Sequence, residues 1–262
     1  MTNPWAHRCA VLLALCISAV IVLGACLTSE IRTFPGAATP STVTAPVMKE
    51  AHVTAGLALI LITCVLAWFM ASSNKPLLGV IGVSAILEIA SISVPIAHAL
   101  ISPIFFSVVV VTAVVTSKSW QTGPTPVESP WGPLRPLGIA VPVFVLIQIA
   151  LGASFRHNAM GVVWHILDAF IVLLVALVAG VFVLRQYPDH PALRPAALAL
   201  VIFTGVQVLL GFAVYMVLLI SSENNMGLIV TGVLHVTNGA LTFAASVVLA
   251  MQMRRNLIQS GV

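Results

Sequence analysis

Long apolar runs, separated by short polar or proline-rich segments, fill most of the chain. A window of about 20 residues, long enough to cross the hydrocarbon core of a bilayer as a helix, fits eight times. Because only helices and closed barrels satisfy every backbone polar group inside lipid, these runs predict membrane-spanning helices. The predicted spans are residues 9–28, 49–71, 77–94, 97–116, 137–155, 162–184, 195–220 and 228–253.

Proline-rich segments mark the connections between these helices, because proline in a helix interior removes a hydrogen bond and clashes with the preceding turn. Residues 29–48 form one such loop, and residues 118–136, which hold five prolines, form another. The second loop divides the chain into two parts of four helices each, residues 1–128 and residues 129–262.

Composition and charge place the chain in a membrane. Hydrophobic residues make up 60% of the sequence and charged residues 7%, which excludes an ordinary soluble domain. With the N-terminus inside, eight basic residues fall on the cytoplasmic side and three on the outer side. This distribution indicates how the chain is oriented in the membrane and does not indicate binding to nucleic acid. It predicts a multi-pass protein of a bacterial-type inner membrane with both termini in the cytoplasm.

Four histidines occupy matching places in the even-numbered spans. His52, His98, His165 and His235 each lie near the start of an apolar run, and the predicted topology puts all four near the outer face. His-Val-Thr-Ala-Gly at residues 52–56 nearly repeats as His-Val-Thr-Asn-Gly at residues 235–239. A histidine inside a bilayer-length segment is costly unless it is paired or ligated, so each is a candidate functional residue.

The odd-numbered spans carry a related signature. Gln-Ile-Ala-Leu-Gly at residues 148–152 matches Gln-Val-Leu-Leu-Gly at residues 207–211, and residues 20–24 and 88–92 are looser copies, the latter with Glu88 in the place of the glutamine. The chain therefore consists of four copies of a helix hairpin. The predicted fold class is all-α: a polytopic membrane protein with eight transmembrane helices in two pseudo-symmetric four-helix bundles.

Small residues follow each histidine by three or four positions, on the same helical face. They are Ala55, Gly56, Ser102, Ala169, Asn238 and Gly239. Two explanations stay open at this point. Small residues let membrane helices pack closely, and they would also give clearance to a flat macrocycle.

Ligation of heme iron by two histidines is the first interpretation of this pattern, because it needs two neutral imidazoles that face each other across an apolar slot. Four histidines provide two such pairs, His52 with His98 and His165 with His235. A zinc or copper site would require acidic or sulfur ligands at compact spacing, and the sequence has none at such spacing. A proton relay that includes Glu88 or Asp168 stays open, as do histidines that only hydrogen-bond across helices.

Three further residues are candidates at the predicted outer ends of helices. Arg156 and His157 could pair with a heme propionate, a role that suits the donor fork of arginine. Glu50 precedes His52 by two residues and could act as an acid or base beside a bound cofactor. Its alternative role is a favourable charge near a helix N-terminus. For Glu88 we expect an interhelical hydrogen bond.

The combined pattern resembles the heme A synthase family of eight-helix membrane proteins. The resemblance lies in Gln-x-x-Leu-Gly-Ala-x-x-Arg-His at residues 148–157, in Gly-x-x-x-His at residues 161–165, in Ile-Ala-His at residues 96–98, and in Leu-His-x-x-Asn-Gly-Ala-Leu at residues 234–241. The first outer loop, residues 29–48, has neither the cysteine pair nor the Pro-Asp-Trp-Pro element common in that family.

The resemblance implies an enzymatic activity and a different role for each histidine pair. Members of the family oxidise the C8 methyl of heme O to a formyl group and so make heme A for cytochrome oxidase. Carried over, His52 and His98 would flank the substrate heme, while His165 and His235 would hold heme b as cofactor. Glu50 would stand for the family's glutamate before the first histidine, although here it lies one position closer. The implied partners are heme, membrane lipid, heme O synthase and cytochrome oxidase subunits.

Two other functions stay open at this point. One is a non-enzymatic b-type heme carrier, electron-transfer or oxidase assembly protein. The other is a small transporter built from inverted hairpins.

Overall fold

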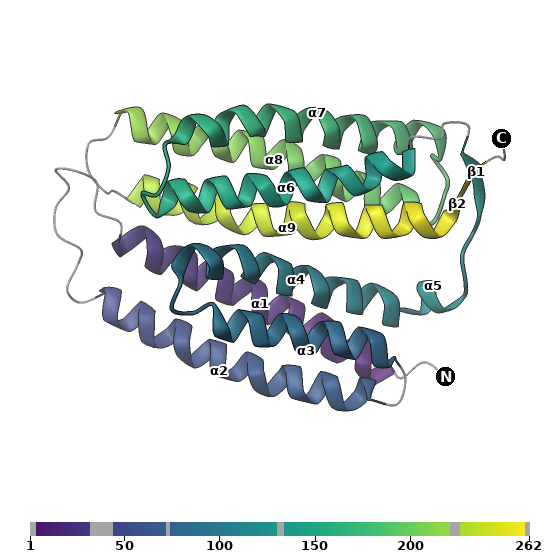
Figure 1. The fold of residues 1–262 in the computed structure, drawn as a ribbon, viewed down its shortest axis with the longest axis horizontal. Helices are drawn as coiled ribbons and strands as arrows, with labels where there is room; N and C mark the ends of the chain where they lie inside the picture. The colour runs from purple at the N-terminus through teal and green to yellow at the C-terminus, as the bar shows by residue number, and fades with distance from the viewer. Residues whose placement is uncertain (1–3, 32–43, 72–73, 130–133, 221–225, 260–262) are drawn as a thin grey trace.

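The described part of the chain is almost entirely helical (Figure 1). The computed structural model describes residues 4–31, 44–71, 74–129, 134–220 and 226–259. Its helices are α1 (Pro4–Ile31), α2 (Thr44–Met70), α3 (Lys75–Ala90), α4 (Pro95–Thr116), α5 (Lys118–Gln121), α6 (Leu134–Arg156), α7 (Val162–Gln186), α8 (Leu193–Ile220) and α9 (Met226–Asn256). Two short strands, β1 (Val127–Ser129) and β2 (Leu257–Gln259), pair in parallel. The prediction of an all-helical polytopic fold is confirmed at this level.

Seven of the described helices are long and apolar enough to cross a membrane. The third predicted span, residues 77–94, is a shorter helix, because residues 91–94 form a turn before Pro95 starts α4. The 16 residues of α3 rise by about 24 Å at about 1.5 Å per residue, against a hydrocarbon core of about 30 Å. Whether α3 completes a set of eight spans therefore stays a prediction.

Helix boundaries also differ from the predicted ones on either side of the first loop. α1 extends from Pro4 to Ile31, and α2 begins at Thr44 although its predicted start is residue 49. Pro46 lies in the first turn of α2, where its missing N–H costs no helical hydrogen bond. Residues 32–43 of the predicted loop lie outside the described residues.

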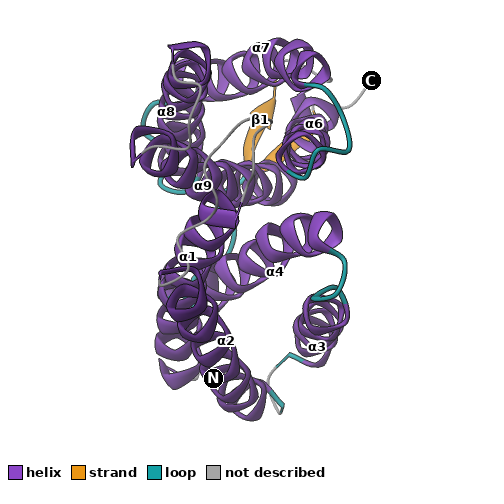
Figure 2. Cartoon of the chain, turned by 90° about the vertical axis from the view of Figure 1, so that its left-hand side faces the viewer, coloured by secondary structure: helices purple, strands orange, loops and turns teal. Residues whose placement is uncertain are grey.

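The helices fall into two groups that meet side by side (Figure 2). α1–α4 form one group and α6–α9 the other, and α9 packs against α1 and α4 as well as α8 and α6. Ala240 and Ala244 of α9 join a buried cluster with Leu13, Leu66 and Phe106 of the first group. α9 is therefore the helix that the two groups share.

A second buried cluster joins the helices of the group α6–α9. It contains Val145 of α6, Ala176 of α7, Leu200 of α8 and Leu249 of α9. Because each of its four helices contributes to one cluster, this group is a closed bundle.

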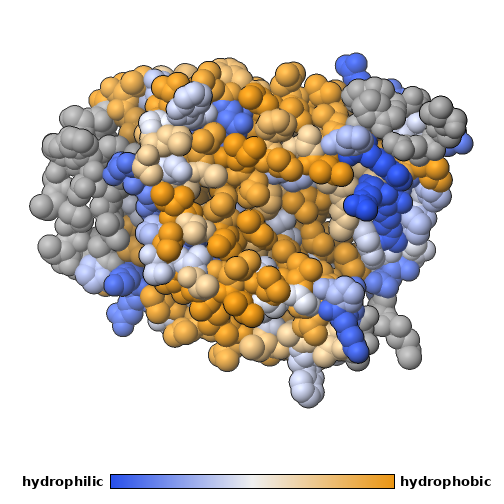
Figure 3. Space-filling model, viewed as in Figure 1, coloured by the Kyte–Doolittle hydropathy of each residue, from blue (hydrophilic) through white to orange (hydrophobic). Residues whose placement is uncertain are grey.

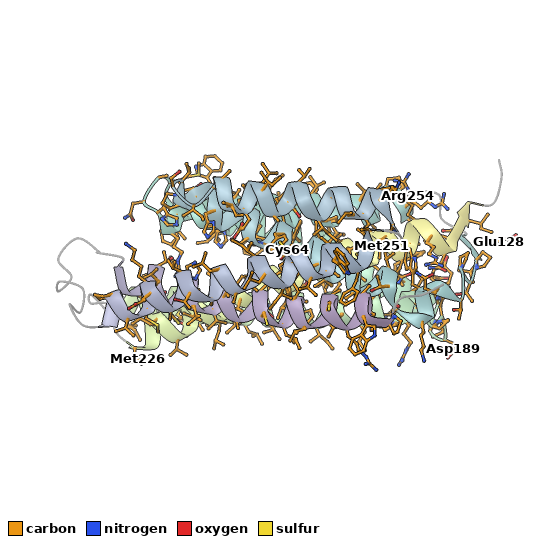
Figure 4. All side chains as sticks on the ribbon, turned by 90° about the horizontal axis from the view of Figure 1, so that it is seen from below. Cys64, Glu128, Asp189, Met226, Met251 and Arg254 are labelled. Atoms are coloured by element: carbon orange, nitrogen blue, oxygen red, sulfur yellow. The ribbon has the colours of Figure 1, made fainter. Side chains whose placement is uncertain are left out.

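The surface has a broad apolar belt with polar residues gathered at the two ends of the bundle (Figure 3). Exposed residues within the belt include Trp68, Phe170 and Leu209. Large exposed apolar surface of this kind is expected where lipid is the solvent. Met226 lies at one end of α9, while Arg254, Glu128 and Asp189 lie at the other end (Figure 4). The start of α1 and the end of α9 lie at the same end of the molecule (Figure 1).

Candidate functional site: two histidine pairs

The four histidines come together as two pairs, one in each group of helices. The ring centroids of His52 on α2 and His98 on α4 are 6.3 Å apart, with an angle of 90° between the rings. The centroids of His165 on α7 and His235 on α9 are 6.0 Å apart, at 81°. These are the two pairs expected from the sequence, and their geometries nearly match.

Each of three histidine rings packs against a glycine of the helix that precedes its own. A Cβ added at Gly24 would lie 2.9 Å from Cε1 of His52, and one at Gly152 would lie 2.9 Å from Cε1 of His165. A Cβ added at Gly211 would lie 3.1 Å from Cε1 of His235. Such distances are too short for carbon atoms in contact. The glycines of the repeated signature therefore make room for the imidazoles.

The ring of His165 is oriented by a main-chain hydrogen bond. Its Nδ1 lies 3.1 Å from the carbonyl oxygen of Gln148. Since a carbonyl oxygen only accepts, Nδ1 carries the proton and donates it, which leaves Nε2 with a free lone pair. The side-chain nitrogen of Gln148 lies 3.5 Å from Nε2 of His165. His165 is thus held in the tautomer that a metal ligand at Nε2 requires.

His235 has a side-chain partner at the equivalent position. Nε2 of Gln207 lies 3.3 Å from Nδ1 and 3.3 Å from Nε2 of His235. Asn238, one turn after His235, donates to Oε1 of Gln207 at 2.7 Å and to the carbonyl of Phe203 at 2.9 Å. Asn238 therefore fixes which end of the Gln207 amide faces the imidazole.

A carboxylate takes the place of the amide beside His98. Oε1 of Glu88 lies 3.5 Å from His98 Nδ1, and the Ser91 hydroxyl lies 3.3 Å from the same nitrogen. Ser102, one turn after His98, donates to Oε1 of Glu88 at 2.5 Å. The interhelical hydrogen bond expected of Glu88 is confirmed. In addition, the structure brings Glu88 to the histidine, a contact the sequence reasoning missed.

His52 differs from the other three histidines. Its Nδ1 is buried and has no hydrogen-bond partner among the described residues. Val20 stands where the other copies of the repeat have a glutamine or a glutamate. No side chain at that position can therefore accept or donate a hydrogen bond.

The small residues one turn after the histidines differ in what surrounds them. A Cβ added at Gly56 would meet no described atom within 4 Å, so there is open space beside His52. A Cβ at Gly239 would lie 3.3 Å from Nε2 of Gln207, so this glycine permits close packing next to His235. Close packing is therefore shown beside His235, and clearance for a macrocycle stays a prediction.

Arg156 connects the two groups of helices at one end of the molecule. Its Nη2 donates to the carbonyl of Ala25 at 2.6 Å and to the hydroxyl of Ser29 at 2.7 Å. Its Nη1 also lies beside α9, 3.7 Å from where a Cβ at Gly232 would be, one turn before His235. His157, the other predicted propionate partner, follows at the end of α6, where its backbone N–H bonds to the carbonyl of Ala153.

Glu50 is not brought to a histidine pair. It is exposed on α2, two residues before His52, and side chains two positions apart on a helix do not face each other. Because α2 begins at Thr44, Glu50 also lies beyond the first turn, where the helix dipole favours acidic residues most. Among the described residues, no contact supports either role predicted for Glu50, and both roles stay predictions.

The histidine sites contain two candidate ligands each. In the described part of the chain, no three His, Cys, Asp or Glu side chains gather into a group that could hold a metal ion. Asp168, one turn after His165, is buried, and its Oδ2 has no hydrogen-bond partner within the described ranges.

The spacing of the pairs can be compared with that of two imidazoles on one metal. An imidazole nitrogen lies about 2 Å from a bound metal and about 1.1 Å from the centre of its own ring. Two rings on opposite sides of one metal therefore have centroids about 6 Å apart. The observed 6.3 and 6.0 Å fit this value, and the glycine contacts leave room for the rings in that position.

The chain matches no protein-family model and no curated protein.

Proposed function

We propose that this protein is an integral membrane heme protein of the heme A synthase type. In this proposal it oxidises the C8 methyl of heme O to a formyl group for cytochrome oxidase assembly. The observation that carries the proposal is the matched spacing of the two histidine pairs, 6.3 and 6.0 Å between ring centroids. A pair of facing imidazoles supplies two axial ligands, and the remaining positions around iron belong to the porphyrin.

The two pairs have different tasks in this proposal. His165 and His235 hold heme b in a closed bundle, where Gln148, Gln207 and Asn238 set the orientation of the rings. Hydrogen-bonded partners of this kind fix ligand orientation at metal sites. Heme bound there supplies reversible one-electron transfer. If Nε2 of His165 or His235 held iron, iron would replace the glutamine amide there, while the bond from His165 Nδ1 to the Gln148 carbonyl would remain.

His52 and His98 flank the substrate heme. The open space beside Gly56 supports this assignment, because a substrate has to enter and leave. Conversion of a methyl to a formyl group with water as the oxygen source releases four electrons and four protons. The reaction therefore needs an external electron acceptor. Glu50 stays the predicted acid or base, and Arg156 and His157 stay the predicted partners of propionates.

The proposal includes the finer features of the membrane arrangement. α3 completes eight spans in two pseudo-symmetric bundles, residues 1–128 and 129–262. The histidine pairs then lie toward the outer face of a bacterial-type inner membrane, with both termini in the cytoplasm. The repeated contacts of Gly24, Gly152 and Gly211 with histidines support this arrangement. Heme O synthase and cytochrome oxidase subunits are the proposed partners.

Heme binding can be tested on the purified full-length protein. We expect absorption and electron paramagnetic resonance spectra of low-spin heme with two histidine ligands after loading with heme b. A protein that takes up no heme under these conditions would point to the small transporter and would refute the proposal.

The enzymatic part needs a separate test. Co-expression with a heme O synthase, followed by extraction of the hemes, should yield a formyl-bearing heme. Bound heme O without any formyl product would favour the second candidate, a non-enzymatic heme carrier, electron-transfer or oxidase assembly protein. The missing motifs of residues 29–48 favour that candidate.

A further inference from the structure

We propose that Glu88 is a positioning residue that lowers the reduction potential of a heme on the His52–His98 pair relative to one on the His165–His235 pair. The inference rests on the proposed function, because it concerns heme held by these histidines. Glu88 acts through His98, whose Nδ1 lies 3.5 Å from its Oε1. It would not touch iron or substrate itself.

The carboxylate of Glu88 is built into its place. Ser102 donates to Oε1 at 2.5 Å, so that oxygen is fixed on the side that faces the imidazole. The other oxygen, Oε2, is buried and has no hydrogen-bond partner in the described part of the chain. An ionised Glu88 would be little screened at Oε2, and its effect would fall mainly on its nearest polar neighbour, His98.

The sequence repeat supplies an internal comparison. Gln148 and Gln207 occupy the position of Glu88 in the other group of helices. The Gln148 amide lies against Nε2 of His165 and the Gln207 amide lies against both ring nitrogens of His235, whereas Glu88 contacts Nδ1 of His98. The two sites thus differ at one repeated position by the exchange of a neutral amide for a carboxylate.

Further charge separates the two sites in the same direction. Arg156 lies beside α9, where its Nη1 would be 3.7 Å from a Cβ added at Gly232, one turn before His235, and a positive charge favours the ferrous state of iron. A carboxylate beside the outer nitrogen of a ligating histidine makes that ligand more basic, which favours the ferric state. Only one electron is exchanged in the ferric–ferrous couple, and no group is transferred. We therefore expect electrons to reside preferentially on the His165–His235 side.

The test is a potentiometric titration of the full chain loaded with heme b at both pairs. Glu88→Gln converts the position into its counterpart in the other half without a change of size. We expect the midpoint potential of one heme to rise by at least 59 mV, a tenfold change in the ferric–ferrous equilibrium. The potential of the second heme should stay unchanged. His98→Ala, which removes one ligand, identifies which potential belongs to the altered site.

Two further variants keep the test decisive. Glu128→Gln removes an exposed carboxylate on β1, outside both histidine pairs, so its potentials should equal those of the wild type. Gln207→Glu should lower the potential of the other heme, and it decides the matter if Glu88→Gln does not load.

The outcomes separate this inference from the proposed function. Normal low-spin spectra with potentials unaffected by Glu88→Gln would overturn the inference and leave the proposed function standing. If the wild-type chain binds no heme, the proposed function fails first and the inference with it.

Discussion

Gly152→Ala probes the contact on which the geometry of the His165–His235 pair depends. The added Cβ would lie 2.9 Å from Cε1 of His165 and 3.2 Å from its Nδ1. Carbon atoms in contact prefer about 3.5–4.0 Å, so the ring has to move by roughly 0.6 Å or more. That displacement acts against the hydrogen bond between His165 Nδ1 and the Gln148 carbonyl, which is 3.1 Å long.

The energetic effect of this substitution should appear mainly in the heme-bound state. Without heme the imidazole can turn away from the new methyl group, whereas ligation holds it in place. Overpacking typically costs about 1–3 kcal/mol, which corresponds to a roughly 5- to 150-fold loss of heme affinity. Titration of the purified protein with heme b, followed by the Soret absorbance, measures this loss.

Gly205→Ala on α8 is the matched control, because its Cβ would meet no atom of the described chain within 4 Å. Both substitutions improve helix propensity by about 1 kcal/mol, so general effects on the helices are the same in the two variants. Heme affinity should fall for Gly152→Ala alone. Equal affinity of Gly152→Ala and wild type would show that the glycine does not position His165 as a heme ligand.

Three other substitutions test separate parts of the account. Asn238→Leu removes the donor that orients Gln207 and leaves polar groups unpaired, which costs about 1–3 kcal/mol. Calorimetry of heme binding should therefore show a weaker affinity for heme. An unchanged affinity would show that Asn238 does not belong to the site. Arg156→Met removes two hydrogen bonds between α6 and α1. Because bonds from a charged donor contribute about 1.5–3 kcal/mol, the detergent-solubilised protein should lose about that much stability. A melting temperature equal to that of the wild type would contradict this. Glu50→Gln should abolish the formyl product in extracted heme while heme binding persists, and a retained product would end the predicted catalytic role of Glu50.

The pairing of the histidines could be predicted from the sequence because two independent patterns agree. Apolar windows fix the approximate helices, and in the predicted topology the starts of the even-numbered spans, which are α2, α4, α7 and α9 in the structure, lie at similar depth. The hairpin repeat then relates His52 to His165 and His98 to His235. Side-chain periodicity alone could not show that the rings meet, since that depends on how the helices pack.

The parts of the site that could not be predicted depend on helix ends and tertiary contacts. α3 ends at Ala90 because residues 91–94 turn before Pro95, although their apolar residues continue the pattern. The earlier start of α2 does not alter the spacing of Glu50 and His52, but it removes Glu50 from the first turn. Arg156 bonds to α1, a helix more than a hundred residues away in sequence, so no local signal indicates this partner.

The contacts of Glu88 could be predicted from the sequence only in part. The repeat placed it beside glutamines and indicated a packing role, and Ser102 does bond to it. The same repeat also contained the signal for its second contact, because a glutamine or glutamate recurs together with a histidine in three of the four hairpins. The contact itself is known only from the structure, in which Glu88 Oε1 lies 3.5 Å from His98 Nδ1.

The central claim, that imidazoles of paired helices hold heme, is tested most directly by counting low-spin hemes per chain in single histidine variants. Electron paramagnetic resonance of the loaded protein should show two low-spin species in the wild type. His98→Ala should remove one species and His235→Ala the other, while His7→Gln, outside both pairs, should keep both. Spectra that stay the same in His98→Ala and His235→Ala would contradict the account.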